Sequence, residues 1–80
     1  MVDLDWNLIK SFVAVAEAGS LSAASRRLSA SQPTLGRHIA DLEMALGVTL
    51  FRRGRRGYEL TEAGAVLYER GKTVSDEAAA

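Results

Sequence analysis

Residues 31–47, SQPTLGRHIADLEMALG, have their hydrogen-bonding side chains gathered at one end. Gln32 carries an amide that donates and accepts hydrogen bonds, Thr34 carries a hydroxyl, and Arg37 follows about one helical turn later. Pro33 adds a compact apolar surface between them. None of these side chains is a strong nucleophile or general base, so they suit recognition of a polar partner rather than catalysis. The stretch therefore predicts a binding surface whose partner lies outside the chain.

A helix at residues 32–46 is required to position these side chains. Apolar residues recur at the spacing of one buried helical face: Leu35, Ile39, Leu42 and Leu46. Ser31 is a good N-cap, Pro33 lies in the first turn where its missing N–H costs nothing, and Gly47 is placed to end the helix. At about 100° per residue, the residues left on the opposite side are Pro33, Arg37, Ala40 and Met44.

Two further helices are predicted before this one. Residues 5–19, DWNLIKSFVAVAEAG, have apolar residues at helical spacing, which outweighs the slight strand preference of their β-branched side chains. A second, short helix reaches Leu28, with Ser20 or Ser22 as its N-cap. Residues 29–31 then form a joint of about three residues, which is in the range of a helix-turn-helix motif.

The segment after these helices predicts a cationic hairpin. In residues 48–61, VTLFRRGRRGYELT, apolar residues flank the sequence RRGRRG, whose glycines suit a turn. Thr61 is placed to cap a last helix. We therefore divide the chain into one domain at residues 1–61 and the beginning of a further helix at residues 62–80.

The composition is that of one small globular domain, with 80 residues of which 48% are hydrophobic and 25% charged. There is no cysteine and His38 is the single histidine, so we expect no disulfide, no metal site and no cofactor. The beginning MVDLDW lacks the features of a signal peptide, and no apolar run approaches the ~20 residues that span a bilayer. These features predict a cytoplasmic protein without membrane contact.

The formal net charge is zero, but the charges are unevenly distributed. Between residues 26 and 56, seven arginines accompany only two acidic residues, Asp41 and Glu43, which leaves a local excess of five positive charges. Solution screening weakens charges beyond ~8–10 Å, so a ligand responds to this local patch more than to the total. The patch predicts an anionic partner.

Three helices, a basic hairpin and a further helix, in this order, are typical of the winged helix-turn-helix, a mainly α fold with a short two-stranded wing. Its second motif helix enters the DNA major groove and presents its N-terminal residues to the bases. Gln32 suits adenine N6 and N7, and Pro33 suits a thymine methyl group. Thr34 can make either contact, while Arg37 can reach a phosphate or a guanine.

A second set of residues is expected on the DNA backbone or, in the hairpin at residues 52–57, in the minor groove. Arginine is attracted to the narrow minor groove, and the free N–H groups of a helix N-terminus favour a phosphate. This set comprises Ser31, Arg26, Arg27, Arg53, Arg55 and Arg56.

Each feature also has a simpler explanation. A polar first turn is common on surface helices, and clustered arginines can form a solvated turn, so only their combination favours DNA. The alternative function is a protein-interaction module, in which the last helix dimerises and the basic patch binds an acidic protein. An enzyme is disfavoured, because the chain has little equipment for acid–base or covalent catalysis. The aromatic residues expected in the core are Trp6, Phe12, Phe51 and Tyr58.

Two segments, FVAVAEAGSLSAASRRLSASQPTLGRHIADLEMALGVTLF and RRGYELTEAG, strongly resemble the N-terminal DNA-binding domain of LysR-type transcriptional regulators. The resemblance covers nearly the whole chain without gaps. It implies a winged helix-turn-helix that binds double-stranded DNA, and a long last helix that pairs with its copy in a homodimer. It also implies a following effector-binding domain that senses a small molecule, which is absent from these 80 residues.

The resemblance extends to individual positions. The residues that match the family's groove-reading helix are Gln32, Pro33, Thr34 and Arg37. Arg53 and Arg56 match basic positions of the wing, and Arg56 is the expected minor-groove residue. Gly36 departs from the family, which usually has a serine before the arginine, and Gly71 occupies a position usually filled by alanine or larger residues. The second departure leaves open what the last helix packs against at that point.

Overall fold

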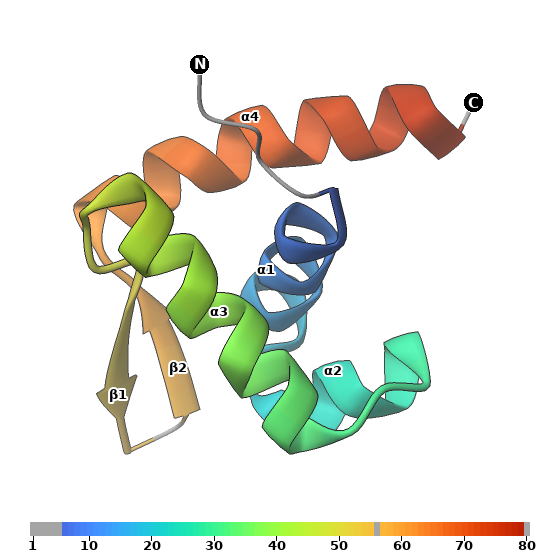
Figure 1. The fold of residues 1–80 in the computed structure, drawn as a ribbon, viewed down its shortest axis with the longest axis vertical. Helices are drawn as coiled ribbons and strands as arrows, with labels where there is room; N and C mark the ends of the chain where they lie inside the picture. The colour runs from blue at the N-terminus through green and yellow to red at the C-terminus, as the bar shows by residue number, and fades with distance from the viewer. Residues whose placement is uncertain (1–5, 56, 80) are drawn as a thin grey trace.

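A computed structural model describes residues 6–55 and 57–79, with side chains of the last helix described as far as Lys72. Within these residues the chain forms four helices and one antiparallel pair of strands, in the predicted order (Figure 1). The elements are α1 (Trp6–Ala18), α2 (Leu21–Leu28), α3 (Gln32–Leu46), β1 (Phe51–Gly54), β2 (Gly57–Leu60) and α4 (Glu62–Ala79). The predicted winged helix-turn-helix is confirmed.

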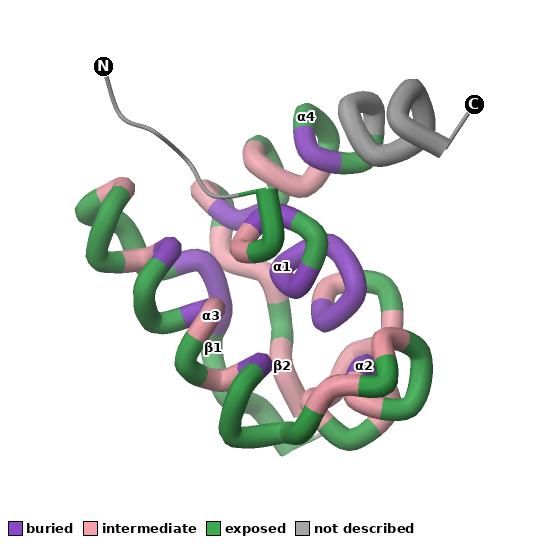
Figure 2. Tube along the Cα trace, turned by 45° about the vertical axis from the view of Figure 1, so that its right-hand side comes forward, coloured by how far each residue is buried: buried purple, intermediate pink, exposed green. Residues whose placement is uncertain are grey.

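The core forms around α1, which packs against α2, α3, α4 and β2. Figure 2 shows buried positions concentrated along α1 and along one side of α3, as the helical spacing predicts. The largest fully buried side chains are Phe12, Val15, Leu35, Leu42 and Leu50. The prediction that Trp6 belongs to the core is wrong, since this first residue of α1 keeps 40% of its surface exposed.

The joints between the helices follow from local capping. The Ser20 hydroxyl accepts a hydrogen bond from the Ala23 N–H at 3.1 Å, so Ser20 rather than Ser22 is the N-cap of α2. At the end of α2, Ser29 adopts a left-handed conformation with φ of 54°. Ser31 then caps α3 by accepting from the Thr34 N–H at 3.2 Å. These caps fix the angle at which α3 follows α2.

The hairpin is closed at its base and attached to the helices farther along. Near its base, the Thr61 N–H donates to the Leu50 carbonyl at 3.0 Å, and the Thr61 hydroxyl donates to the Thr49 carbonyl at 2.6 Å. Farther along, the N–H of Tyr58 in β2 donates to the Gly19 carbonyl, in the turn between α1 and α2, at 3.0 Å. The hairpin is therefore held beside the helix-turn-helix instead of extending freely from it.

Helix α4 packs closely against the rest of the domain at two glycines. Gly64 lies so close to the Leu50 carbonyl oxygen that a β-carbon at this position would overlap it. Gly71 is buried, and a β-carbon there would lie 3.1 Å from Val13 and 3.5 Å from Ile9. The packing partner at Gly71 is therefore α1, and both glycines allow a close approach. Among the described helices, none is long and apolar enough to cross a membrane.

We predict opposite effects for alanine at two helical glycines. Gly64→Ala lowers the free energy of unfolding by about 1–3 kcal/mol, because its new methyl group overlaps backbone that cannot move aside. Gly36→Ala is the matched control, and it raises the free energy by up to about 1 kcal/mol, because a β-carbon there meets only Leu21 at 3.7 Å among the described residues. Urea unfolding followed by circular dichroism measures both, and equal effects would contradict the packing described.

Candidate nucleic-acid interface

The first turn of α3 is exposed, as the sequence predicts. Gln32, Pro33, Thr34 and the capping Ser31 all belong to the exposed class. The Ser31 hydroxyl donates to the Thr34 hydroxyl oxygen at 2.8 Å, which leaves the Thr34 hydroxyl hydrogen free to donate to an external acceptor. Four side chains with different recognition chemistry therefore occupy one solvent-facing tip.

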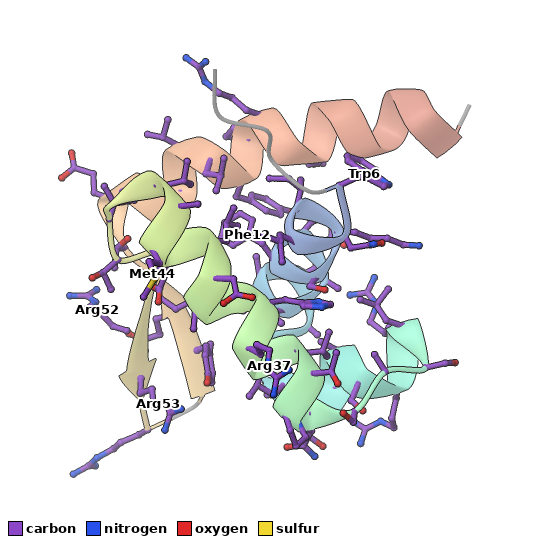
Figure 3. The ribbon with its side chains drawn as sticks, in the orientation of Figure 1. Trp6, Phe12, Arg37, Met44, Arg52 and Arg53 are labelled. Carbon is purple, nitrogen blue, oxygen red and sulfur yellow. The ribbon has the colours of Figure 1, made fainter. Side chains whose placement is uncertain are left out.

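The exposed side of α3 continues from this tip along the helix. Arg37, Ala40 and Met44 are all exposed, and Met44 keeps 84% of its surface accessible. Figure 3 shows Arg37 on the outer side of α3, away from Phe12 in the core. The predicted division of α3 into one buried stripe and one open face is confirmed, with the predicted base-reading side chains in the N-terminal half of the open face.

The hairpin places exposed arginines beside this face. Arg52, Arg53 and Arg55 are exposed, whereas Arg56 lies outside the described residues. Arg52 and Arg53 point to different sides of β1 in Figure 3, as alternation along a strand requires. Arg53 is on the same side as buried Phe51, and it lies directly across the sheet from Tyr58. Arg53 therefore lies on the side of the hairpin that also carries Phe51.

A hollow of about 320 Å³ lies between the helix-turn-helix and the hairpin. Its lining residues are Ser20, Leu21, Ser22, Gln32, Arg53, Gly54, Gly57 and Tyr58. The predicted base reader Gln32 and the wing residue Arg53 thus border one space, although 21 positions separate 32 from 53 in the sequence. Ser20 and Ser22 were predicted only as helix caps, and their place in this lining had no signal in the sequence.

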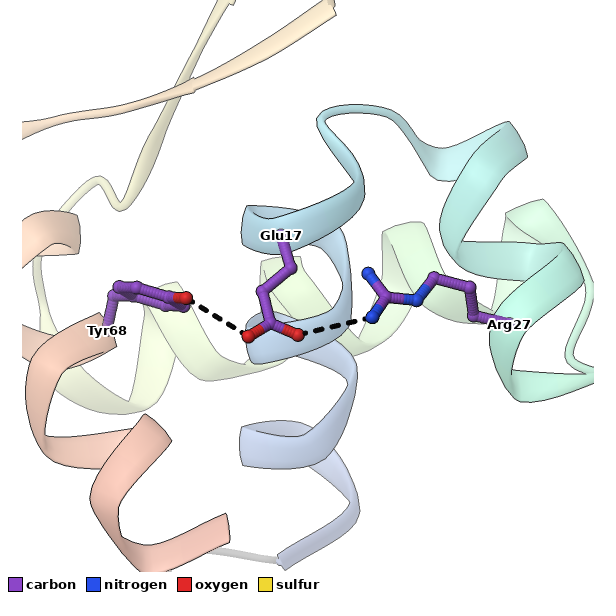
Figure 4. A network of polar contacts seen from close by, with 3 residues as sticks. All are labelled: Glu17, Arg27 and Tyr68. Carbon is purple, nitrogen blue, oxygen red and sulfur yellow. Dashed lines mark hydrogen bonds and ion pairs between the residues drawn. The ribbon is translucent and has the colours of Figure 1, made fainter. Parts of the chain in front are cut away.

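The two arginines of α2 have different surroundings. Arg26 donates to the Ser22 hydroxyl at 3.3 Å, and so lies along α2 in the direction of the hollow. Arg27 instead forms an ion pair with Glu17 of α1 at 3.5 Å, and the other oxygen of Glu17 accepts from the Tyr68 hydroxyl at 3.1 Å (Figure 4). The Glu17 carboxylate therefore links α1, α2 and α4, and Arg27 has an intramolecular role that its sequence position did not reveal.

His38 forms a polar contact inside the helix-turn-helix. Its Nδ1 lies 2.7 Å from the hydroxyl oxygen of Ser11, a buried residue of α1. The histidine is half-buried, as expected for a residue at the edge of the core. In the described ranges, histidine and acidic side chains form no group of three or more that could hold a metal ion.

Glu43 has a positioning role that the sequence analysis did not identify. Its Oε2 accepts hydrogen bonds from the backbone N–H groups of Leu50 at 2.7 Å and Phe51 at 3.4 Å. The carboxylate thus ties the end of α3 to the beginning of β1, and it sets the distance between the two elements that border the hollow. The sequence showed Glu43 only as one of two acidic residues among seven arginines, and it gave no sign of this role because the partners of Glu43 are backbone groups.

An exposed second helix of a helix-turn-helix motif, flanked by a basic hairpin, defines the chain as a winged helix-turn-helix protein. Residues 6–65 match the family model described as "Bacterial regulatory helix-turn-helix protein, lysR family". The chain belongs to the LysR family of bacterial regulatory proteins.

Individual relatives agree with this assignment. The chain is 48% identical over 66 residues to the regulator ClcR of Pseudomonas putida, a match that covers 82% of this chain and 22% of ClcR. The DNA-binding domain of CbnR in complex with DNA superposes with a TM-score of 0.87 at 42% identity, over 95% of this chain and 87% of that one. The BenM domain bound to benA site 1 DNA superposes with a TM-score of 0.88 at 32% identity. This match covers 94% of this chain and 84% of the BenM chain. The chain thus spans about a fifth of the length of curated relatives such as ClcR.

We predict that Glu43→Ala lowers the free energy of unfolding by about 1–3 kcal/mol, because it leaves two backbone N–H groups at the base of the hairpin without their acceptor. Asp41→Ala removes an acidic side chain from an exposed position of the same helix, and we expect a change within about 0.5 kcal/mol. Chemical unfolding of both variants measures the difference. Similar stabilities would show that Glu43 does not hold the hairpin.

Proposed function

We propose that this chain is the DNA-binding part of a bacterial transcription regulator and that it binds double-stranded DNA with sequence preference. The observation that carries the proposal is the shared border of the α3 tip and the basic hairpin around one hollow. A surface that only binds an acidic protein does not require a polar helix tip beside a cationic hairpin. The DNA complexes of the similar CbnR and BenM domains support the same interpretation.

The geometry suits simultaneous contact with two neighbouring grooves. The major groove is about 12 Å wide and admits a helix, while the minor groove attracts arginine. With α3 in the major groove and residues 52–57 at the adjacent minor groove, one sugar–phosphate strand must pass between them. That strand meets the hollow, where Ser22 offers a hydroxyl and Arg53 offers a guanidinium. Ser31 and Arg26 are placed to contact the flanking phosphates.

The bases are read from the first turns of α3. Gln32 pairs with an adenine edge, Pro33 contacts a thymine methyl group, and Thr34 adds a hydroxyl. Arg37, one turn farther along the exposed side, binds a phosphate or a guanine. Each of these side chains is exposed.

The wing supplies the remaining cationic contacts. Arg55 is exposed at the end of the hairpin, and we assign Arg56 to the minor groove on its match to the family's wing. Arg27 contacts the DNA backbone only at the expense of its ion pair with Glu17.

We further propose that α4 forms a homodimer with a second copy. The helix has 18 residues, packs on α1 through its glycine side, and exposes 57% of Val66. The proposal is supported by the resemblance to LysR-type regulators, which implies a last helix that pairs with its copy, and Val66 offers an apolar side chain for such a contact. Response to a small-molecule effector would require a domain outside these residues.

We predict a steep dependence of DNA affinity on salt. Each phosphate neutralised by a cationic side chain contributes a slope of about −0.9 to the plot of log K against log salt concentration. Fluorescence anisotropy with random and with selected duplexes measures the slope. Absence of binding to any duplex at low salt would leave the protein-interaction alternative standing, and a flat salt dependence would exclude the arginines from the interface.

We predict that Gln32→Ala changes sequence preference at one base position. The loss there is about 1–3 kcal/mol, because the amide no longer pairs with the base edge. Arg53→Ala is the comparison, since the loss of a phosphate contact weakens binding to all DNA sequences alike. Selection of bound sequences from a random duplex pool by each variant reads out the difference. Uniform weakening by Gln32→Ala would remove this residue from the set of base readers.

A further inference from the structure

Three aromatic rings and one arginine form a continuous line from the core to the hollow. The Phe12 and Phe51 ring centroids are 5.3 Å apart, and the Phe51 and Tyr58 centroids are 5.5 Å apart in an edge-to-face arrangement. The guanidinium carbon of Arg53 then lies 5.5 Å from the centre of the Tyr58 ring. Phe12 is fully buried and Arg53 is exposed, so the line connects the rigid interior to a solvent-facing cation.

Tyr58 itself is held by independent contacts. Its backbone N–H donates to the Gly19 carbonyl at 3.0 Å, and its ring is half-buried against Phe51. Its hydroxyl oxygen accepts a hydrogen bond from Arg53 Nη2 at 3.1 Å. The ring and the hydroxyl together therefore constrain both the position and the direction of the Arg53 guanidinium.

The contact leaves most of the arginine available. A guanidinium has five N–H donors, and the bond to Tyr58 uses one of them. An arginine on an exposed four-residue strand would otherwise lose considerable rotamer freedom when it binds, and fixing such a side chain costs about 0.5–1.5 kcal/mol. Tyr58 removes part of this cost in advance, since Arg53 already borders the hollow in the free protein.

We infer that Tyr58 is a positioning residue for DNA binding, which holds Arg53 ready for a phosphate of the strand that crosses the hollow. This inference rests on the proposed function, since it concerns the same surface. It assigns to Tyr58 an indirect role: the hydroxyl acts through Arg53 and makes no DNA contact of its own. Tyr58 was expected to be only a core residue, and its neighbour across the sheet gives it this second role.

A double-mutant cycle tests the inference. Dissociation constants for a selected duplex are measured by fluorescence anisotropy for the unmodified chain, Tyr58→Phe, Arg53→Ala and the double variant. Tyr58→Phe keeps the ring and removes only the hydroxyl. We expect it to weaken binding about threefold to tenfold, the factor that corresponds to ordering one flexible side chain. In the Arg53→Ala background, the same change should alter affinity by less than about twofold.

Tyr68→Phe is the matched control. It removes the hydroxyl of the other tyrosine, which bonds to Glu17 and not to Arg53, so any effect on DNA affinity should be the same with and without Arg53. Thermal unfolding of each variant separates a loss of positioning from a loss of stability.

Three outcomes would overturn the inference. One is an unchanged affinity for Tyr58→Phe while the unmodified chain binds DNA. Another is an equal loss with and without Arg53, because the hydroxyl would then contact DNA directly or act through folding. If the unmodified chain binds no duplex at all, the proposed function fails first and the inference fails with it. Coupling between positions 53 and 58, together with no coupling between positions 53 and 68, would support it.

Discussion

The backbone of Leu50 joins three parts of the molecule. Its N–H donates to Glu43 of α3 at 2.7 Å, its carbonyl accepts from the N–H of Thr61 before α4 at 3.0 Å, and its side chain is fully buried. Because Leu50 directly precedes β1, these bonds determine where the hairpin leaves the body. The distance between α3 and the hairpin, on which the proposed contact with two adjacent DNA grooves depends, follows from them.

The hairpin also depends on its attachment to the turn between α1 and α2. Two strands of four residues are marginally stable on their own. The bond from Tyr58 to Gly19 and the ring contact between Tyr58 and Phe51 make them part of the body. The binding surface we propose is therefore preorganised, because its arginine side chains are carried on a backbone that is fixed to the helices. Preorganisation of this kind reduces the entropy lost on association.

Local signals in the sequence were sufficient to predict the helices and strands, but they did not reveal the roles of several side chains. Helical spacing predicted the buried stripe of α3, and serine and glycine at its ends predicted the caps that the structure contains. The exposed tip at Gln32 followed from these two signals. Glu43 and Arg27 could not be interpreted in this way, because their partners lie outside their own helices and, for Glu43, belong to the backbone. Trp6 was placed wrongly because hydrophobicity alone does not show that a residue lies at the edge of a core.

Gly36 gives this scaffold a position at which new chemistry can be introduced. A β-carbon there has ordinary contact distance to Leu21, whereas a β-carbon at Gly64 would overlap backbone. The position lies in α3 between Gln32 and Arg37, so a small side chain can be added without remodelling the helices. If α3 reads DNA as proposed, position 36 is a place where a side chain can be added beside the base-reading residues at little cost to packing.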